Sequence, residues 1–536
     1  MRCRAICVLL GVAANVVFAD CVRQDCLTDE WKAGLPRPVF DEHPELVGLY
    51  MKAWELAHNH IQVLPGLPVP RYMDEGLWDD QIWIWDTCFM VQFCKYHPRE
   101  FPGVESLENF YHVILSDGTT PLPRVTCRYA STRRSGETLD FRIGHADNPP
   151  LFAWTEYKYA LQTGDRARLE RVYVENRWLQ QWYDLFDSFD PEAPLPHGAA
   201  CKVGLKRVKN GYHWQGDPSG MDNSPRGRTK DVKVSNVIDC PNNPDLLWLD
   251  AYAQQGLSAL CLGRIAKLLG RDDEAAVWQK RYQTAKDEIN TAYWDDERGF
   301  YFDILESDGS KVEVMTPASF WPALAEMPSR KMLARMMRWL TDPSTLGGEV
   351  PTPSLARNDP DFDPAGGYWR GGIWLPTSYV TVKALDVYGE FGLARSIARK
   401  IVERMYRTWI DVSPHTIWEC YSPTEDKPST NKLGKFSRVD FCGWSALGPI
   451  SLFLEDIVGV KDANAFDNTL TCDFPKAPVG RIGVENYRFG GIVCSVLATK
   501  EQISVTANRP FVLRVDGRTL SVREGKNLFG RSEASD

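Results

Sequence analysis

The sequence has no long basic run, and its net charge is −9 at pH 7. A partner rich in phosphate calls for clustered lysine and arginine, so nucleic acid is excluded as a partner. After the first twenty residues no apolar run approaches the roughly 20 residues that cross a bilayer, so no transmembrane segment is predicted. The 14 cysteines include no metal-like CxxC pair, and the sequence predicts no metal or cofactor.

Aromatic side chains are abundant, with 19 Trp, 20 Tyr and 23 Phe in 536 residues. Most such rings fill a core, but tryptophan is also favoured where one edge stays wet. A flat ring of this kind can cover the C–H face of a pyranose. The chain is 43% hydrophobic and 25% charged, which is a globular composition with material for a large core. The composition is compatible with a sugar-binding protein.

Residues 1–19 resemble an export signal. They begin with two arginines, continue as a mostly apolar run and end in a motif typical of signal cleavage. We expect export to the periplasm or the extracellular space. Cys21 follows the cleavage motif, but Asp20 disfavours a lipid anchor on that cysteine. Disulfides can form in such a compartment, whereas Cys261 lies in an apolar helical run and is expected to be a buried free thiol.

Helical periodicity dominates the chain from about residue 44 to residue 458. The expected helices cover residues 44–62, 81–90, 105–115, 150–163, 166–187, 243–269, 272–293, 329–341, 373–388, 391–408 and 446–457. At three joins an apolar helix is followed by a charged amphipathic one, without a fixed spacing. This order is typical of antiparallel helix pairs with an apolar inner and an amphipathic outer member. A dozen such helices can close into a ring of six pairs, an (α/α)6 toroid.

The pattern changes after about residue 470. Apolar and polar residues alternate over residues 491–496, 502–507 and 511–515, with turn formers between them, which predicts strands. The predicted fold class is therefore mainly α, an (α/α)6 toroid with a small C-terminal β domain. The predicted division is a signal peptide at 1–19, the toroid domain at 20–465 and the β-rich domain at 466–536.

The first candidate for chemistry is Asp222, which lies in a helix-poor insertion over residues 188–242. Gly220 lets the backbone bend before it and Pro225 fixes the chain after it. A carboxyl group held near apolar groups can keep its proton because desolvation disfavours the charged form. A general acid needs this property. The alternative is an Asx turn, in which the side chain only bonds nearby backbone N–H groups.

The second candidate acid is Glu419, flanked by Trp418 and Cys420. Cys420 as a nucleophile is the weaker alternative, because no histidine or asparagine partner stands out. Two further polar residues lie beside aromatic rings, Asp86 in the helix expected at 81–90 and Arg370 at an expected helix entry. Their alternatives are a cap or core hydrogen bond for Asp86 and a structural ion pair for Arg370.

Six stretches, taken in order, resemble the inverting glycosidases of the trehalase-like (α/α)6 group, and most closely glycoside hydrolase family 63 and the mannosylglycerate hydrolase type. They are Trp85-Asp86, Asn148-Pro149-Pro150, Ser219–Asp222 with Arg226, Trp369–Trp374, Trp418–Tyr421 and Phe441–Trp444. The resemblance covers about residues 44–458. It implies that Asp222 is the general acid and Glu419 the general base.

The resemblance also implies a set of sugar-binding side chains. They are Trp85, Asp86, Asn148, Arg226, Trp369, Arg370, Trp374, Trp418 and Trp444. The chain departs from the family pattern at Asn148, often Gln, at Gly372, often Pro, and at Cys420, often Asn or Lys. None of these departures removes a charged catalytic group, so they bear on the sugar more than on the chemistry.

The expected function is hydrolysis of an α-glycosidic bond, first of all an α-glucoside, in an oligosaccharide or small glycoside. In an inverting enzyme the two carboxyl groups stand about 6.5–9.5 Å apart, and their environments push the two pKa values apart. Asp222 and Glu419 are therefore expected to face each other across one pocket, with Asp222 protonated and Glu419 ionised. The sequence leaves open the sugar, the oligomeric state and any bound calcium.

Several alternatives remain. An α-mannosidase or a glycosylglycerate hydrolase would use the same scaffold. An epimerase or polysaccharide lyase would use a His or Tyr base, and of the nine histidines only His213 lies beside the Asp222 turn. The last alternative is a non-catalytic glycan-binding protein.

Overall fold

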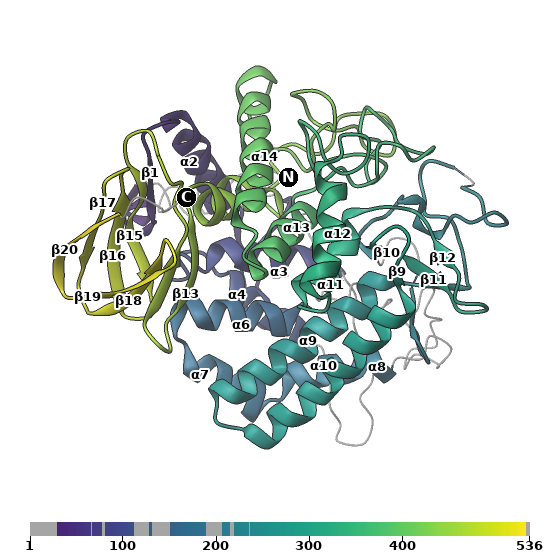
Figure 1. Ribbon diagram of the computed structural model, residues 1–536, viewed down its shortest axis with the longest axis horizontal. Helices are drawn as coiled ribbons and strands as arrows, with labels where there is room; N and C mark the ends of the chain where they lie inside the picture. Colours follow the sequence, from purple (N-terminus) through teal and green to yellow (C-terminus); the bar gives the residue numbers. More distant parts are fainter. Residues whose placement is uncertain are drawn as a thin grey trace, which may run out of the picture.

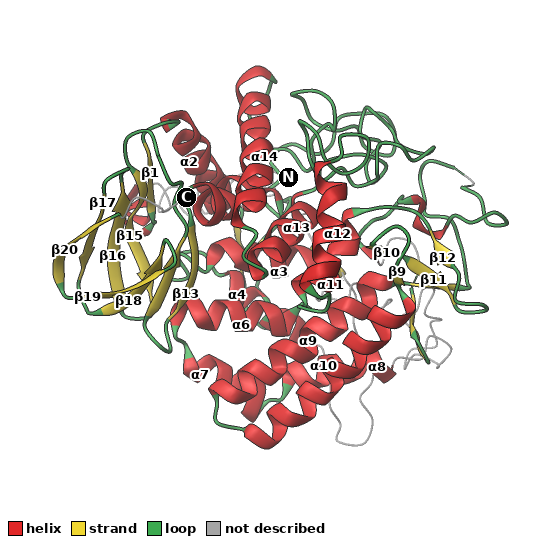
Figure 2. Ribbon diagram, viewed as in Figure 1, coloured by secondary structure: helices red, strands yellow, loops and turns green. Residues whose placement is uncertain are grey.

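The computed structural model describes residues 29–65, 67–77, 81–111, 128–130, 151–188, 206–214, 219–234 and 236–531. The predicted signal peptide over residues 1–19, Cys21 and Asn148 lie outside the described residues. Helices fill the centre of the molecule, and the C-terminal strands form a separate group at one side (Figures 1 and 2).

The helices form inner and outer pairs. The inner helix α3 (Ile84–Cys94) is buried along its whole length, and α9 (Leu249–Leu268) is buried over most of it. The helix α10 (Asp272–Ala292) packs against α9 and buries residues only at every third or fourth position. An apolar stripe of this kind covers one face of a helix and leaves the charged face to solvent. The helix pair predicted at 243–269 and 272–293 is therefore confirmed.

The remaining helices complete the ring, and most follow the predicted ranges. They are α2 (Pro44–Asn59), α4 (Gly103–Ser106), α5 (Glu108–Tyr111), α6 (Phe152–Thr163), α7 (Arg166–Leu169), the π-helix η2 (Glu170–Glu175), α8 (Trp178–Ser188), α11 (Trp321–Leu324), α12 (Arg330–Thr341), α13 (Leu375–Val387), α14 (Phe391–Asp411) and the π-helix η7 (Gly448–Ile457). The single helix predicted at 166–187 was wrong. Arg177 has a φ of 51°, which breaks the helix between η2 and α8 although the apolar spacing continues.

Three inner helices begin in the same way. The residue before each of α3, α9 and α13 is a tryptophan with an extended backbone, respectively Trp83, Trp248 and Trp374. Asp86 lies in the first turn of α3 and Asp250 in the first turn of α9. Acidic side chains are favoured at this end of a helix because the unpaired N–H groups carry partial positive charge.

The strands at the C-terminal end form two sheets. One has the order β1-β15-β16-β17-β20 and the other the order β13-β14-β18-β19. Their bounds are β1 (Arg37–Phe40), β13 (Val460–Asn464), β14 (Thr469–Cys472), β15 (Ile482–Phe489), β16 (Ile492–Ala498), β17 (Gln502–Ala507), β18 (Phe511–Val515), β19 (Arg518–Val522) and β20 (Gly525–Gly530). Every second residue of β16 and β17 is buried, so one face of their sheet is covered.

Two features of these sheets differ from the predicted division. The first C-terminal strand begins at Val460, before the predicted boundary at residue 466. Strand β1, from the N-terminal side of the chain, pairs antiparallel with β15. Short strands also lie within the helical part: β2 (Ile61–Val63), β3 (Arg71–Met73), β4 (Gln81–Trp83), β5 (Arg128–Ala130), β6 (Lys206–Val208), β7 (Gly211–His213), β8 (Leu246–Leu247), β9 (Trp294–Asp295), β10 (Phe300–Tyr301), β11 (Asp303–Leu305) and β12 (Lys311–Val312).

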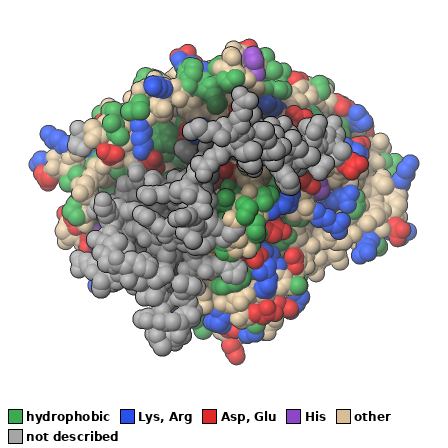
Figure 3. Space-filling view, turned by 180° about the vertical axis from the view of Figure 1, so that it is seen from behind, with side chains coloured by type: hydrophobic (Ala, Val, Ile, Leu, Met, Phe, Trp, Pro, Cys, Tyr) green, Lys and Arg blue, Asp and Glu red, His purple; other side chains and the backbone are tan. Residues whose placement is uncertain are grey.

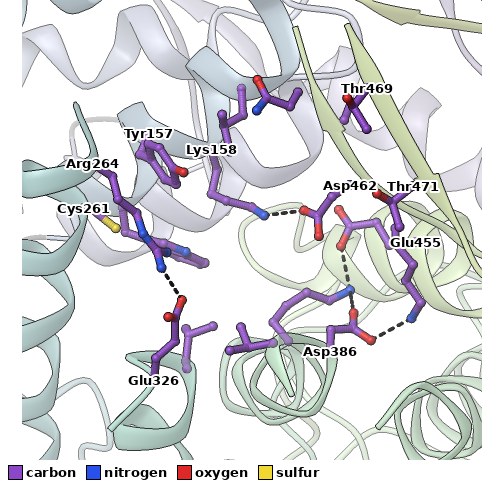
Figure 4. A pocket seen from close by; sticks show the side chains of 18 of the residues that line it. Tyr157, Lys158, Cys261, Arg264, Glu326, Asp386, Glu455, Asp462, Thr469 and Thr471 are labelled. Carbon is purple, nitrogen blue, oxygen red and sulfur yellow. Dashed lines mark hydrogen bonds and ion pairs between the residues drawn. The ribbon is translucent and has the colours of Figure 1, made fainter. Parts of the chain in front are cut away.

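A cavity of about 420 Å³ lies between the ring and the sheets, lined from α6, α9, α13, η7 and strands β13, β14 and β18 (Figure 4). Its charged side chains pair with one another. Lys158 on α6 donates to Asp462 on β13 at 2.7 Å, and Lys461 on β13 donates to Asp386 on α13 at 2.7 Å. Arg264 on α9 donates to Glu326 at 2.6 Å. The two pairs that involve Lys158 and Lys461 attach strand β13 to the ring, and the Arg264–Glu326 pair lies within the ring.

The described surface mixes charges of both signs. Figure 3 shows basic and acidic side chains interspersed over the coloured part of the face seen from behind. In the described ranges, none of the helices has the length and apolar character that crossing a membrane requires. Eight cysteines of the described residues are free thiols, and Cys261 among them is buried, as predicted.

His60, which directly follows α2, makes stability depend on pH. Its side chain is buried, and Nδ1 lies 2.7 Å from the carbonyl oxygen of Asp74. Burial lowers the pKa of His60 to about 4, more than this hydrogen bond raises it. Between about pH 6.5 and pH 4, His60 is therefore protonated in the unfolded chain but neutral in the folded chain. We expect the free energy of unfolding to fall by about 2–3 kcal/mol over this interval from this group alone.

Urea unfolding at pH 7 and pH 4.5 measures this contribution. The variant His60→Gln should lose that part of the decrease, while His415→Gln, at an exposed position, should keep it. An unchanged pH dependence in His60→Gln would show that His60 is not the group responsible.

Candidate active site

The loop that carries Asp222 is fixed by a buried residue and a backbone hydrogen bond. Gly220 adopts a φ of 75°, a conformation that glycine reaches without strain. Met221 is fully buried, and its carbonyl oxygen accepts from the backbone N–H of Ser224 at 2.9 Å. The Asp222 side chain keeps 29% of its surface exposed. The carboxyl group is therefore the part of this loop that remains accessible.

Arg226 anchors the same loop from inside the protein. All five of its N–H groups have protein acceptors: Asp250 and Asp303 each accept two, and the sulfur of Met221 lies 3.8 Å from Nη1. The guanidinium also stacks on the Trp248 ring, 4.7 Å from its centre. Only 2% of the Arg226 side chain is exposed, and each of its donors already has an acceptor. Arg226 therefore lies inside the protein under the Asp222 loop and not at the sugar-binding surface that the resemblance implied. We assign it to positioning the loop.

Glu419 is fixed by two neighbouring segments. The Tyr368 hydroxyl donates to its Oε1 at 2.8 Å, and the Arg438 backbone N–H donates to its Oε2 at 3.2 Å. Its backbone carbonyl accepts from the indole N–H of Trp444 at 3.0 Å. Burial raises the pKa of Glu419, the charge of Asp222 raises it further, and the two hydrogen bonds oppose both effects. The two donors hold the carboxylate in one orientation.

Asn223 connects the Asp222 loop to the segment that supports Glu419. Its amide nitrogen donates to the carbonyl of Gly367 at 2.9 Å, and its side-chain oxygen accepts from the backbone N–H of Trp369 at 2.9 Å. Tyr368, between these two residues, contacts Glu419. The loop of Asp222 and the support of Glu419 are therefore fastened to the same three residues. Sequence reasoning missed Asn223 and Tyr368, although each is adjacent to a residue that it selected.

Asp86 lies near both acids. It is 6% exposed, and its pKa is raised well above the usual value, first by burial and then by the charges of Glu419 and Asp222. Glu75 is fully buried, and its two carboxyl oxygens have no hydrogen-bond partner among the described residues. Its pKa is also raised by burial and by the nearby charges of Asp74 and Asp86. Acids other than Asp222 and Glu419 thus lie close together at this end of the ring.

Tryptophan side chains pack against the segments that hold Glu419: the Trp374 indole N–H donates to the carbonyl of Tyr368 at 3.0 Å, and that of Trp444 donates to the carbonyl of Glu419. Trp369 and Trp374 stack in parallel with their ring centres 4.0 Å apart, and Trp444 lies edge-on to Trp374 at 5.5 Å. Trp85, at the start of α3, packs edge-on to Trp321 at 6.3 Å. Trp418 lies edge-on to Phe436 at 5.9 Å.

Arg370 directly follows Trp369 in the chain and is 3% exposed. Its Nη2 donates to the carbonyl of Asn236 at 3.1 Å, and its Nη1 lies 3.8 Å from a carboxyl oxygen of Asp361. Burial lowers the pKa of Arg370. Within the described ranges, no group of three or more His, Cys, Asp or Glu side chains is arranged to hold a metal ion.

The structure thus brings Asp222, Glu419 and Asp86 to one end of the ring, with the stacked tryptophans beside them. The separation of about 6.5–9.5 Å between the Asp222 and Glu419 carboxyls stays a prediction. His213, the histidine considered as an alternative base, is held away from this chemistry, because its Nε2 pairs with Glu306 at 2.7 Å and its Nδ1 lies 3.1 Å from the Leu246 carbonyl.

Comparison with known proteins gives a family. The profile of the mannosylglycerate hydrolase MGH1-like glycoside hydrolase domain matches residues 112–441. An uncharacterized protein of Borreliella burgdorferi is 24% identical over 415 residues, 75% of this chain and 76% of that protein. The mannosyl-oligosaccharide glucosidase of Saccharomyces cerevisiae is 25% identical over 44% of this chain, and the mannosylglycerate hydrolase of Rubrobacter radiotolerans is 30% identical over 24% of it. The matched region covers 29% of each of these two enzymes.

Solved structures share the fold. The GH63 mannosylglycerate hydrolase of Thermus thermophilus superposes with a TM-score of 0.56 at 17% identity, covering 75% of this chain and 99% of that enzyme. The neutral trehalase Nth1 of Saccharomyces cerevisiae superposes with a TM-score of 0.50 at 15% identity, covering 73% of this chain and 76% of that enzyme. The predicted fold, an (α/α)6 toroid with a C-terminal β domain, is confirmed.

Proposed function

Because the chain belongs to the mannosylglycerate hydrolase MGH1-like glycoside hydrolase family, and is thus a glycoside hydrolase of the GH63 type, we propose that it cleaves an α-glycosidic bond with inversion. Asp222 is the general acid and Glu419 the general base. The observation that carries this assignment is the connection of both acids to residues 367–369, through Asn223 on one side and Tyr368 on the other.

The two acids divide the reaction between them. Asp222 gives its proton to the glycosidic oxygen as the C1–O bond breaks, and the departing alcohol takes that proton. Glu419 removes a proton from a water molecule, which attacks C1 from the opposite face of the ring. The product is a sugar of inverted anomeric configuration, and proton exchange with solvent restores both acids. Tyr368 and the Arg438 backbone N–H hold Glu419 in the orientation that this step needs.

The remaining side chains are assigned to binding. Trp444 is partly exposed and is assigned to an apolar sugar face, whereas Trp369 and Trp374, at 1% and 0% exposed, act by packing behind it. Asp86 accepts hydrogen bonds from sugar hydroxyls. Trp85 and Trp418 extend this aromatic lining. Arg370 and Asn148 are retained as binding residues on the resemblance alone.

An α-glucoside is the first candidate substrate, supported by the likeness to a mannosyl-oligosaccharide glucosidase. An α-mannoside or a glycosylglycerate is the second, supported by the family and by the likeness to a mannosylglycerate hydrolase. Export rests on the composition of residues 1–19, and an exported protein whose sequence begins at Asp20 would support it.

The test is product analysis by proton NMR on a panel of α-glucosides, α-mannosides and glycosylglycerates. We expect a free reducing sugar whose first anomer is β, appearing before mutarotation mixes the two forms. An α anomer formed first would contradict inversion. An unsaturated or isomerised sugar would point to a lyase or an epimerase, and binding without any product to a glycan-binding protein.

A further inference from the structure

Lys432 is presented to the site by a tight turn. The backbone N–H of Asn431 donates to the carbonyl of Lys435 at 2.6 Å, and Gly434 closes the turn with a φ of 74°. The preceding residue, Thr430, accepts from the backbone N–H of Tyr368 at 2.7 Å. The turn is therefore fixed to the segment that supports Glu419, and its position relative to the two acids is set by backbone hydrogen bonds.

The ammonium group of Lys432 pairs with Asp222 and lies over the ring of Tyr368. Nζ is 2.9 Å from Oδ2 of Asp222 and 5.5 Å from the centre of the Tyr368 ring, whose hydroxyl donates to Glu419. The Lys432 and Asp222 side chains are 22% and 29% exposed. Partial burial shields the pair from water, so its Coulomb attraction exceeds that of a fully exposed pair.

This contact conflicts with the role of an acid. A general acid must carry its proton when the glycosidic oxygen departs, and an adjacent cation stabilises the carboxylate instead. Asp86 and Glu419 also interact electrostatically with Asp222, and negative charge on these two carboxyl groups favours the protonated form of Asp222. Removing the ammonium would take away this stabilisation of the carboxylate and leave the repulsion from the neighbouring acids, so protonation of Asp222 would be favoured more than in the wild type.

We propose that Lys432 is a positioning residue that keeps Asp222 ionised in the free enzyme. Bound substrate must move the Lys432 ammonium group away from Asp222 before the reaction. This inference rests on the proposed function. Oxygen atoms of the leaving group compete with Asp222 for the ammonium group. Once Lys432 turns to them, Asp222 takes a proton from solvent and later gives it to the departing oxygen. Asp222 therefore becomes protonated only when a leaving group with such acceptors is bound.

The pH dependence of Lys432→Met against the wild type tests the proposal. The alkaline limb of kcat/KM reports the acid of the free enzyme, and the alkaline limb of kcat reports the acid of the complex. We expect the limb of kcat/KM to move to higher pH by about one unit or more in Lys432→Met, because the stabilising cation is lost. The limb of kcat should move much less, because Lys432 has already left Asp222 in the complex.

Lys435→Met is the matched control, since Lys435 lies in the same turn and is exposed. It should leave both limbs in place. An unmoved limb of kcat/KM in Lys432→Met would overturn the proposal, and so would equal shifts in both limbs, which would mean that the pair persists in the complex.

A second measurement needs no turnover. In protein labelled with carbon-13 at the aspartate carboxyls, the Asp222 signal is the one missing from Asp222→Asn. Its titration midpoint should rise in Lys432→Met by the same amount as the kcat/KM limb. If no glycoside is hydrolysed, the proposed function fails, but this titration still decides whether Lys432 controls the ionisation of Asp222. An unchanged midpoint would contradict that control.

Discussion

Replacing Asp222 by asparagine is expected to lower kcat for unactivated α-glycosides by about 10²–10⁴-fold. Asparagine keeps the shape of the side chain but has no acidic proton to give, so the leaving alkoxide would have to depart unprotonated. KM should change little, because the sugar-binding rings are untouched. Glycosyl fluorides, whose leaving group needs little help from an acid, should lose much less activity. Steady-state kinetics on both substrate types measures the difference.

Asp231→Asn provides the control, because Asp231 is an exposed acid on the same long loop, and it should behave as wild type. The free energy of unfolding of Asp222→Asn should stay close to that of wild type, since the pair with Lys432 is partly exposed and such pairs contribute little. Hydrolysis of unactivated glycosides at the wild-type rate by Asp222→Asn would remove Asp222 from the mechanism.

The helical part of the fold could be predicted because its signal is local. The residues that α10 buries recur along one face, and such a stripe can be recognised within a single helix. The pairing of β1 with β15 could not be predicted, because it joins Arg37 to Glu485 and depends on the whole ring between them. Strands of two or three residues, such as β8 and β11, are too short to show a period of their own.

The candidate site likewise contains residues that the sequence predicted and contacts that it did not. The resemblance selected Asp222 and Glu419 from short motifs, and the structure connects both to residues 367–369. The resemblance also selected Arg226, yet a motif does not reveal whether an arginine faces the sugar or the core. Lys432 carries no motif, and only the turn at residues 431–435 brings it to Asp222. Contacts between distant loops are what the sequence could not supply.

Replacing Arg226 by methionine is expected to lower the free energy of unfolding by about 3–5 kcal/mol, because it leaves two buried carboxylates without their cation. Asp250 and Asp303 are both within 3.0 Å of the guanidinium and both nearly inaccessible to solvent. The pKa of Asp303 is raised by burial and by the charge of Asp250, and Arg226 opposes this. Without the arginine, at least one of the two acids must take up a proton or the loop must open. Urea unfolding at pH 7 measures the loss.

Removing the two carboxylates as well distinguishes the cost of unpaired charge from the cost of lost packing. The triple variant Arg226→Met, Asp250→Asn, Asp303→Asn should recover part of the lost stability, since neutral amides cost less to bury than unpaired carboxylates. Arg298→Ala, which breaks the exposed pair with Glu313, should cost no more than about 1 kcal/mol. If Arg226→Met is no more harmful than Arg298→Ala, the buried pair does not hold the Asp222 loop. Activity should fall with stability, because Met221 and the loop lose the group on which they rest, and the acid would then be displaced from the face of the sugar that it must protonate.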